Sequence, residues 1–228
     1  MSQELNLPTL SEFVTNLIPQ DETSLSALAL AHKALSEPVL NHSLRVFLIA
    51  KYLSKKEGTP YAGKTEESAL FVAAICHDLG SSDLYNGSQR FEVEGADAAK
   101  AHLISHGGTP ERGHQVWVAI ALHTSPGIAE RIDPFTRLLR VATSSDFSWD
   151  LAKQLDVDGY RRELEENLPR LEVERCLADA VVNQAVDPQK VDRLTWPNTQ
   201  KHPLGSWPGG LLRGHLENPN HDGVNPAF

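Results

Sequence analysis

The stretch FVAAICHDLGSSD, residues 71–83, decides both the fold and the chemistry that this chain can carry. Six apolar residues are followed at once by an imidazole, His77, and a carboxylate, Asp78. A helix that only fills a core has no use for this polar pair, whereas a helix that delivers ligands to a metal ion needs it. Gly80 then ends the helix.

The dipeptide alone is weak evidence, because a chain with 10 histidines produces such pairs by chance. A second pair, His221-Asp222, lies in a Pro/Asn/Gly-rich segment that we interpret as a surface turn. The surroundings of His77 therefore decide between a metal ligand and an ordinary helix-end histidine.

Length and composition fit one globular domain in a reducing compartment. The 228 residues are 40% hydrophobic, and no apolar stretch approaches the roughly 20 residues that cross a bilayer. The N-terminus lacks the features of a secretory signal. Cys76 and Cys176 have apolar helical surroundings and no CxxC partner, which predicts free buried thiols. We therefore expect a cytoplasmic protein without a thiolate zinc site.

The net charge of −9 narrows the range of partners. Nucleic acids and anionic membranes are bound by basic surfaces, so neither is an expected partner. The charge also disfavours a polyphosphate substrate, whereas a small neutral substrate meets no such objection. The sequence does not fix the oligomeric state and is compatible with a homo-oligomer.

Helical periodicity recurs along the chain, while alternating strand patterns with hairpin turns are absent, so the fold class is predicted to be all-α. Thr23 or Ser24 is expected to cap the second helix, and Thr65 to open the fourth. Helices are expected over residues 9–18, 23–35, 38–58, 65–77, 94–106, 110–123, 134–147, 158–167 and 170–185.

The chain is expected to divide into three segments, and its composition changes sharply in the last of them. We expect an N-terminal helical extension at residues 1–37, a catalytic domain at 38–190 and a Pro/Gly-rich tail at 191–228. Trp196 and Trp207 favour a tail that wraps the body over a disordered one, although its composition assigns no helix to it.

Two further side chains are placed where they can join His77 and Asp78. His42 lies one turn into an amphipathic helix, on or near its buried side. Asp146 ends an apolar helix, where a lone carboxylate is costly to bury unless it is paired or metal-bound; Asp150 is its rival. Two imidazoles and two carboxylates suit Zn²⁺, Fe²⁺ or Mn²⁺.

The order H…HD…D resembles the HD-domain superfamily of helical metal-dependent hydrolases. Within it, five motifs look like the fungal-type cyanamide hydratases: NHSLRVF (41–47), CHDLG (76–80), FEVEGADAAKAHLISHG (91–107), ALHTSPGIA (121–129) and VATSSDF (141–147). The resemblance spans about residues 38–150 and implies a single-domain helical HD bundle with bound zinc. It implies the metal ligands His42, His77, Asp78 and Asp146, and a substrate-contacting pair, His123 and Thr143.

The activity that the resemblance implies is the zinc-dependent hydration of cyanamide to urea. Metal-bound hydroxide would attack the nitrile carbon of this small uncharged molecule, with His123, Thr143 and Asp78 as the catalytic residues. We expect His123 to donate a proton or hydrogen bond to the nitrogen, and the Thr143 hydroxyl to hold the amine or the hydroxide. The plainer alternatives are that each side chain bonds only to its own helix.

Three other functions stay open on the sequence alone. They are hydration of another small nitrile or isocyanide, HD-type nucleotide phosphohydrolysis, and a non-catalytic helical binding role. A phosphohydrolase needs Lys or Arg near the metal, whereas Ser81, Ser82 and Asp83 follow the HD motif. Arg45 and Arg90 keep this alternative open.

Several other side chains carry weaker predictions. Glu94 is either a first-turn charge or an acid that supports the site. His102 and His106 are four residues apart but have no further ligand nearby, so a solvated face is expected. Apolar candidates to line a substrate pocket are Ile75, Leu79, Phe91 and Phe147.

Overall fold

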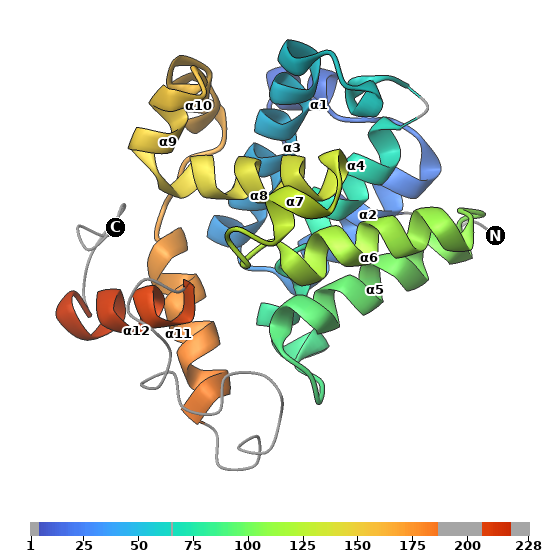
Figure 1. The fold of residues 1–228 in the computed structure, drawn as a ribbon. Helices are drawn as coiled ribbons and strands as arrows, with labels where there is room; N and C mark the ends of the chain where they lie inside the picture. The colour runs from blue at the N-terminus through green and yellow to red at the C-terminus, as the bar shows by residue number, and fades with distance from the viewer. Residues whose placement is uncertain (1–4, 65, 187–206, 220–228) are drawn as a thin grey trace.

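The computed structural model describes residues 5–64, 66–186 and 207–219, and within these ranges the protein contains helices and loops but no strand (Figure 1). The all-α prediction is confirmed. In chain order the elements are α1 (Glu12–Leu17), α2 (Glu22–Ala34), α3 (Glu37–Glu57), η1 (Pro60–Ala62), α4 (Glu67–Cys76), η2 (Leu79–Ser81), η3 (Asp83–Tyr85), α5 (Phe91–Ser105), α6 (Pro110–Leu122), α7 (Ala129–Ile132), α8 (Pro134–Phe147), α9 (Trp149–Gln154), α10 (Asp158–Asn167), α11 (Val173–Val186) and α12 (Trp207–Glu217).

Helices α3 and α4 form the centre of the molecule. Helix α3 is buried without a break from Val39 to Ala50, and α4 from Ala69 to Cys76. A helix that is apolar all round is buried on every side, and α4 accordingly packs against α2, α3, α5 and α6. The end of α4, where the polar pair of the HD motif follows, therefore lies inside the protein.

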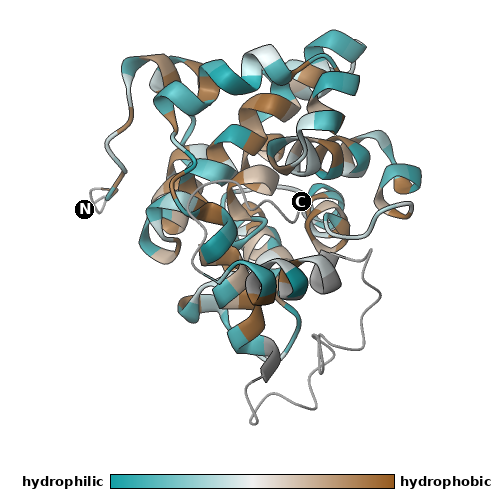
Figure 2. Cartoon of the chain, turned by 90° about the vertical axis from the view of Figure 1, so that its left-hand side faces the viewer, coloured by the Kyte–Doolittle hydropathy of each residue, from teal (hydrophilic) through white to brown (hydrophobic). Residues whose placement is uncertain are grey.

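The outer helices are amphipathic and close this centre off from solvent. In Figure 2 the surrounding helices carry both hydrophobic and hydrophilic residues, and most of the residues that they bury are hydrophobic. Helices α5 and α6 lie side by side, and α8 packs against α3 and α6 (Figure 1). The core brings α3, α4, α6 and α8 together, and these are the helices that carry the predicted site.

Helix ends follow the sequence signals at most positions. Pro38 lies in the first turn of α3, and Gly58 ends it in a left-handed conformation with φ 69°. The cap prediction for α2 is wrong, because Asp21 accepts from the Ser24 N–H at 3.0 Å and the helix begins one residue before Thr23. Thr65 lies outside the described residues.

Three helices, α7, α9 and α12, were not predicted. The first two have only four and six residues, too short to establish a period. Helix α12 lies in the Pro/Gly-rich tail, with a proline at its second position, where proline fits a first turn. Its Leu211 packs with Phe91, Ala178 and Val181. The tail segment that contains Trp196 lies outside the described residues.

The prediction of two buried thiols is correct for Cys76 and wrong for Cys176. Both cysteines are free, but Cys176 is only half-buried on α11. Burial raises the pKa of the Cys76 thiol to about 12, so this sulfur is unreactive. None of the helices in the described ranges is long and apolar enough to cross a membrane.

Candidate metal centre

Three ligand-type side chains meet where α3 passes the end of α4. His42 projects from α3, His77 forms the C-cap of α4, and Asp78 begins the turn into η2. All three are buried, and one ligand atom from each lies within 4.8 Å of the others. No other such group of three occurs within the described ranges. The sequence prediction that His42 joins the HD pair in space is therefore fulfilled.

The ligand atoms face a common point. His42 Nε2 lies 3.2 Å from His77 Nε2 and 3.7 Å from Asp78 Oδ2. His77 Nε2 lies 3.2 Å from the same carboxylate oxygen. These separations are the size expected between neighbouring ligands of one ion with metal–ligand distances of about 2.1 Å.

The other ring nitrogens fix both tautomers. His77 Nδ1 lies 2.6 Å from the Ala74 carbonyl, which can only accept, so this nitrogen carries the proton. His42 Nδ1 donates in the same way to the Asp146 carboxylate at 2.7 Å. Each neutral ring therefore turns a bare Nε2 lone pair toward the other, and two such lone pairs repel unless a cation or proton lies between them.

Asp78 supplies the clearest sign of a missing positive charge. Its buried Oδ2 has no hydrogen-bond partner among the described residues. Burial would raise the pKa of Asp78, but the neighbouring imidazoles of His77 and His42 hold it below its usual range, so the group is an anion. An unpartnered buried anion beside two imidazole lone pairs fits a divalent ion such as Zn²⁺.

The two histidines differ in basicity. Burial lowers the pKa of His42, although its bond to Asp146 opposes the shift. Burial also acts to lower the pKa of His77, but the negative charge of Asp78, 3.2 Å from Nε2, outweighs it, and the pKa is raised. In the metal-free protein, His77 is therefore the ring that takes up a proton.

His123 approaches the group from the C-cap of α6. Its Nε2 lies 3.7 Å from Asp78 Oδ1, and its Nδ1 donates to the Ile120 carbonyl at 2.6 Å. Burial, helped by the charge of His77, lowers the pKa of His123 to about 3. The ring is therefore neutral and presents a lone pair, which makes it a proton acceptor in this state. The expected donation of a proton by His123 to the substrate stays a prediction.

Thr143 lies on α8 at the edge of the same space. Its hydroxyl proton is donated to the Leu139 carbonyl at 2.9 Å, which is the bond to its own helix that the sequence left as the plainer alternative. The hydroxyl oxygen keeps a lone pair and is available as an acceptor.

A pocket of about 240 Å³ opens beside the group. Its lining consists of His123, Thr124, Arg140, Thr143, Ser144, Phe147 and Ser148. Of the four apolar residues predicted to line it, only Phe147 does so, and its ring lies 4.6 Å from that of His42. Ile75 and Leu79 are fully buried in the core instead, and Phe91 packs toward α11 and α12.

Asp146 lies outside the group of three. Its Oδ2 accepts from His42 Nδ1, and Arg45 binds both carboxylate oxygens at 2.8 Å. Burial would raise its pKa, but Arg45 and His42 hold it well below the usual range. Its rival Asp150 is exposed on α9.

Glu92 supports the site and was missed by the sequence analysis. It is fully buried on α5, where its Oε1 accepts from the Thr124 hydroxyl at 2.5 Å and from Arg90 at 2.7 Å. Thr124 follows His123, so this bond anchors the turn that positions the ring. Glu94 was the other candidate for an acid that supports the site. It accepts a hydrogen bond from the backbone N–H of Gln89 near the start of its helix, as a first-turn charge does.

The remaining histidine predictions have simple outcomes. His102 contacts the Thr23 carbonyl at 2.9 Å, and His106 contacts the carbonyl of His102. Neither belongs to a ligand group, although His102 is buried, contrary to the expected solvated face. His221-Asp222 lies outside the described residues.

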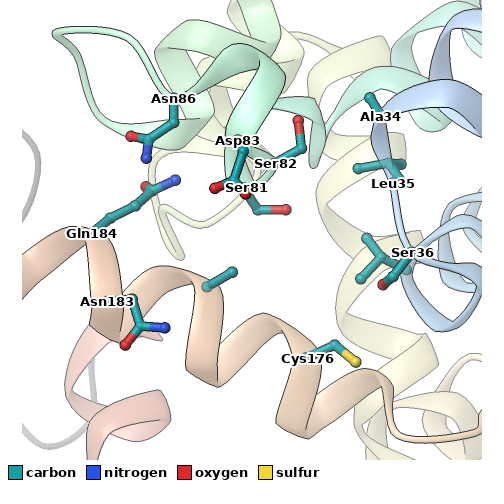
Figure 3. A pocket seen from close by; sticks show the side chains of 12 residues that line it. Ala34, Leu35, Ser36, Ser81, Ser82, Asp83, Asn86, Cys176, Asn183 and Gln184 are labelled. Atoms are coloured by element: carbon teal, nitrogen blue, oxygen red, sulfur yellow. The ribbon is translucent and has the colours of Figure 1, made fainter.

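A second cavity, of about 410 Å³, lies between the α2–α3 connection, the η2–η3 segment and α11 (Figure 3). Cys176 and Gln184 of α11 face Ser81 across it. The Gln184 amide donates to the Gly80 carbonyl at 2.8 Å. Helix α11 thus supports the backbone just after Asp78.

Gly80 is required by the close approach of α5. A Cβ at this position would lie 2.0 Å from the Phe91 carbonyl oxygen, which is backbone and cannot move aside. We expect Gly80→Ala to lower the free energy of unfolding by about 1–3 kcal/mol, measured by urea denaturation. Gly159→Ala is the control, because nothing lies within 4 Å of its Cβ and alanine favours the helix. Equal stability of the two variants would contradict this reading of the turn.

The helical fold and the buried His/His/Asp group define a class: the chain belongs to the HD domain family, whose model matches residues 39–183. Family and group together indicate a divalent metal site in a metal-dependent enzyme. Two proteins of Saccharomyces cerevisiae, named cyanamide hydratase DDI2 and cyanamide hydratase DDI3, are each 26% identical to this chain over 166 residues. The similarity covers 72% of this chain and 72% of each relative.

Proposed function

We propose that this protein hydrates cyanamide to urea at a zinc ion held by His42, His77 and Asp78. The observation that carries the proposal is the meeting of two Nε2 lone pairs with an unpartnered carboxylate oxygen beside a small pocket. The names of the two yeast relatives support the choice of substrate. When bound, zinc supplies a water whose pKa falls to about 7, and thus a nucleophile at neutral pH.

His123 moves the proton in this proposal. Its Nε2 lone pair accepts a proton from the attacking water, because Nδ1 is already committed to the Ile120 carbonyl. With a pKa lowered to about 3, the ring holds this proton weakly and passes it to the nitrile nitrogen as the C–O bond forms. The product of this addition is isourea, which tautomerises to urea. One side chain thereby accepts a proton and then donates it, and the second step is the donor role expected from the sequence.

The hydroxyl acceptor in the pocket favours a nitrile that carries N–H groups. The Thr143 oxygen offers a lone pair, and the amino group of cyanamide has N–H groups that can donate to it. A plain nitrile or an isocyanide has no such donor and would leave this acceptor unpaired, at a cost in binding. Hydration of those molecules is therefore the second candidate.

Nucleotide phosphohydrolysis has less support. Arg45 is fully buried and bound to Asp146, and Arg90 is bound to Glu92, so neither offers a free phosphate clamp. Arg140 lines the pocket but pairs with Glu130 at 3.4 Å and donates to the His123 carbonyl. The pocket of about 240 Å³ is also smaller than the 300–1,000 Å³ typical of sites for larger ligands.

The test is a product-resolved assay on the zinc-loaded protein. We expect urea from cyanamide without ammonia, and loss of turnover when a chelator removes the metal. Nucleoside triphosphates serve as the competing substrates, with phosphate release as the readout. Phosphate release without urea at millimolar cyanamide would reverse the ranking.

Zinc affinity should fall with acidity, beginning above pH 6.5. Burial acts to lower the pKa of His77, but Asp78 outweighs it and raises the pKa above the ordinary 6.5. The metal-free form thus binds more protons than the loaded form, and affinity falls by about tenfold per pH unit below that pKa. Competition with a chromophoric chelator, corrected for its own titration, measures this. Constant affinity from pH 8 to pH 6 would contradict the prediction.

A further inference from the structure

We infer that Asp146 acts on the metal centre through His42 without being a ligand, and that Arg45 and Arg170 hold it in this role. The inference rests on the proposed metal site of His42, His77 and Asp78. It makes Asp146 and Arg45 positioning residues, and it departs from the ligand set that the family resemblance implies.

The position of Asp146 relative to the His42 ring is the first argument. Its Oδ2 accepts from Nδ1 at 2.7 Å, whereas the ligand group meets at Nε2. These two nitrogens point to opposite sides of the imidazole. A carboxylate bound at Nδ1 is therefore separated by the whole ring from an ion at Nε2. This is the arrangement in which a carboxylate orients a metal-binding histidine and fixes its tautomer.

The occupation of both carboxylate oxygens is the second argument. Arg45 donates from Nε to Oδ1 and from Nη2 to Oδ2, each at 2.8 Å, in a two-pronged pair. Arg45 lies on α3 one turn after His42, and its side chain is fully buried. Turning Asp146 toward the ligand group would break this pair and leave a buried guanidinium without its partner.

The backbone of Asp146 is fixed as well. Arg170, in the connection between α10 and α11, donates to the Asp146 carbonyl at 2.7 Å and lies 3.4 Å from Oδ2. Arg161 of α10 donates to the Ser145 carbonyl at 3.0 Å. Two arginines thus satisfy the last carbonyls of α8, which have no partner within the helix.

The position of Asp146 determines how many protein ligands the ion has. With Asp146 behind His42, the protein supplies three ligands, and the remaining positions on the ion stay open for water and substrate. Arg45 additionally donates to the Leu168 carbonyl at 2.9 Å, so the orientation of His42 depends on a segment more than 120 residues away in the chain.

A crystal structure of the zinc-loaded protein at the zinc absorption edge tests this directly. We expect the ion beside His42 Nε2, with Asp146 still bound to Nδ1 and Arg45. An Asp146 oxygen within about 2.2 Å of zinc would overturn the inference and leave the proposed function standing. A protein that binds no zinc at all would overturn the metal site, and with it both proposals.

Two variants test the same point in solution. Asp146→Asn should weaken zinc binding by about 10–100-fold, while the cobalt-substituted protein keeps the visible absorption spectrum of the parent. Asp78→Asn, which changes a proposed ligand, should alter that spectrum or abolish cobalt binding. Arg45→Lys, which keeps the charge without the two-pronged pair, should weaken zinc binding less than Arg45→Met. A changed cobalt spectrum in Asp146→Asn would contradict the inference. So would a zinc affinity equal to that of the parent in Asp146→Asn and in both Arg45 variants.

Discussion

His77→Ala should purify without stoichiometric zinc and should lose at least about a hundredfold in turnover of cyanamide. Changing a residue that only hydrogen-bonds to a metal ligand already costs about 10–100-fold in metal affinity or activity. His77 is one of the proposed ligands, so its loss should cost at least as much. The loss also removes the imidazole that lies nearest to Asp78, so the charge of this carboxylate is less compensated. Elemental analysis and urea formation measure the two effects.

The matched control is His102→Ala. His102 is also buried and also contacts a backbone carbonyl, but it lies outside the ligand group. It should keep the full zinc content and turnover. Stoichiometric zinc in His77→Ala would show that the ligands have been misassigned, whatever the activity.

His123→Ala should keep its zinc and lose about 10²–10⁴ in kcat, the usual contribution of a positioned acid–base group. His123→Gln separates two roles, because its amide oxygen can still accept an N–H but cannot take a proton. We expect Gln to restore KM toward that of the parent while kcat stays low. Steady-state kinetics on zinc-loaded protein measure both parameters.

His114→Ala serves as the control for this pair, since His114 is exposed on the same helix. Its kinetics should match those of the parent. If kcat in His123→Ala equals the parental value, His123 has no part in the proton transfer.

Much of the fold could be predicted because its signals are local. The unbroken apolar run before His77 predicts a helix buried on all sides, and Pro38 and Gly58 mark the limits of α3. His42 could be matched for the same reason, since it lies on a helix with a clear buried side, and Asp78 follows directly on the end of another buried helix.

What could not be predicted depends on contacts distant in the chain. The position of Asp146 is set by Arg45 and Arg170, and no spacing rule relates these residues. The direction of proton transfer at His123 depends on which ring nitrogen meets the Ile120 carbonyl, a detail that periodicity does not carry. Glu92 could not be singled out, because only its contact with Thr124, 32 residues away in the chain, distinguishes it from the other acidic residue in the first turn of α5.

The hydrogen bond from Gln184 to Gly80 bears on where this enzyme can be trimmed. The span that matches the family ends at residue 183, one position before Gln184. A fragment that ends at residue 183 would retain His42, His77 and Asp78. It would lose the hydrogen bond from Gln184 to the Gly80 carbonyl, two residues after Asp78. We therefore expect the smallest fragment with an intact site to extend past the span that matches the family and to include at least Gln184.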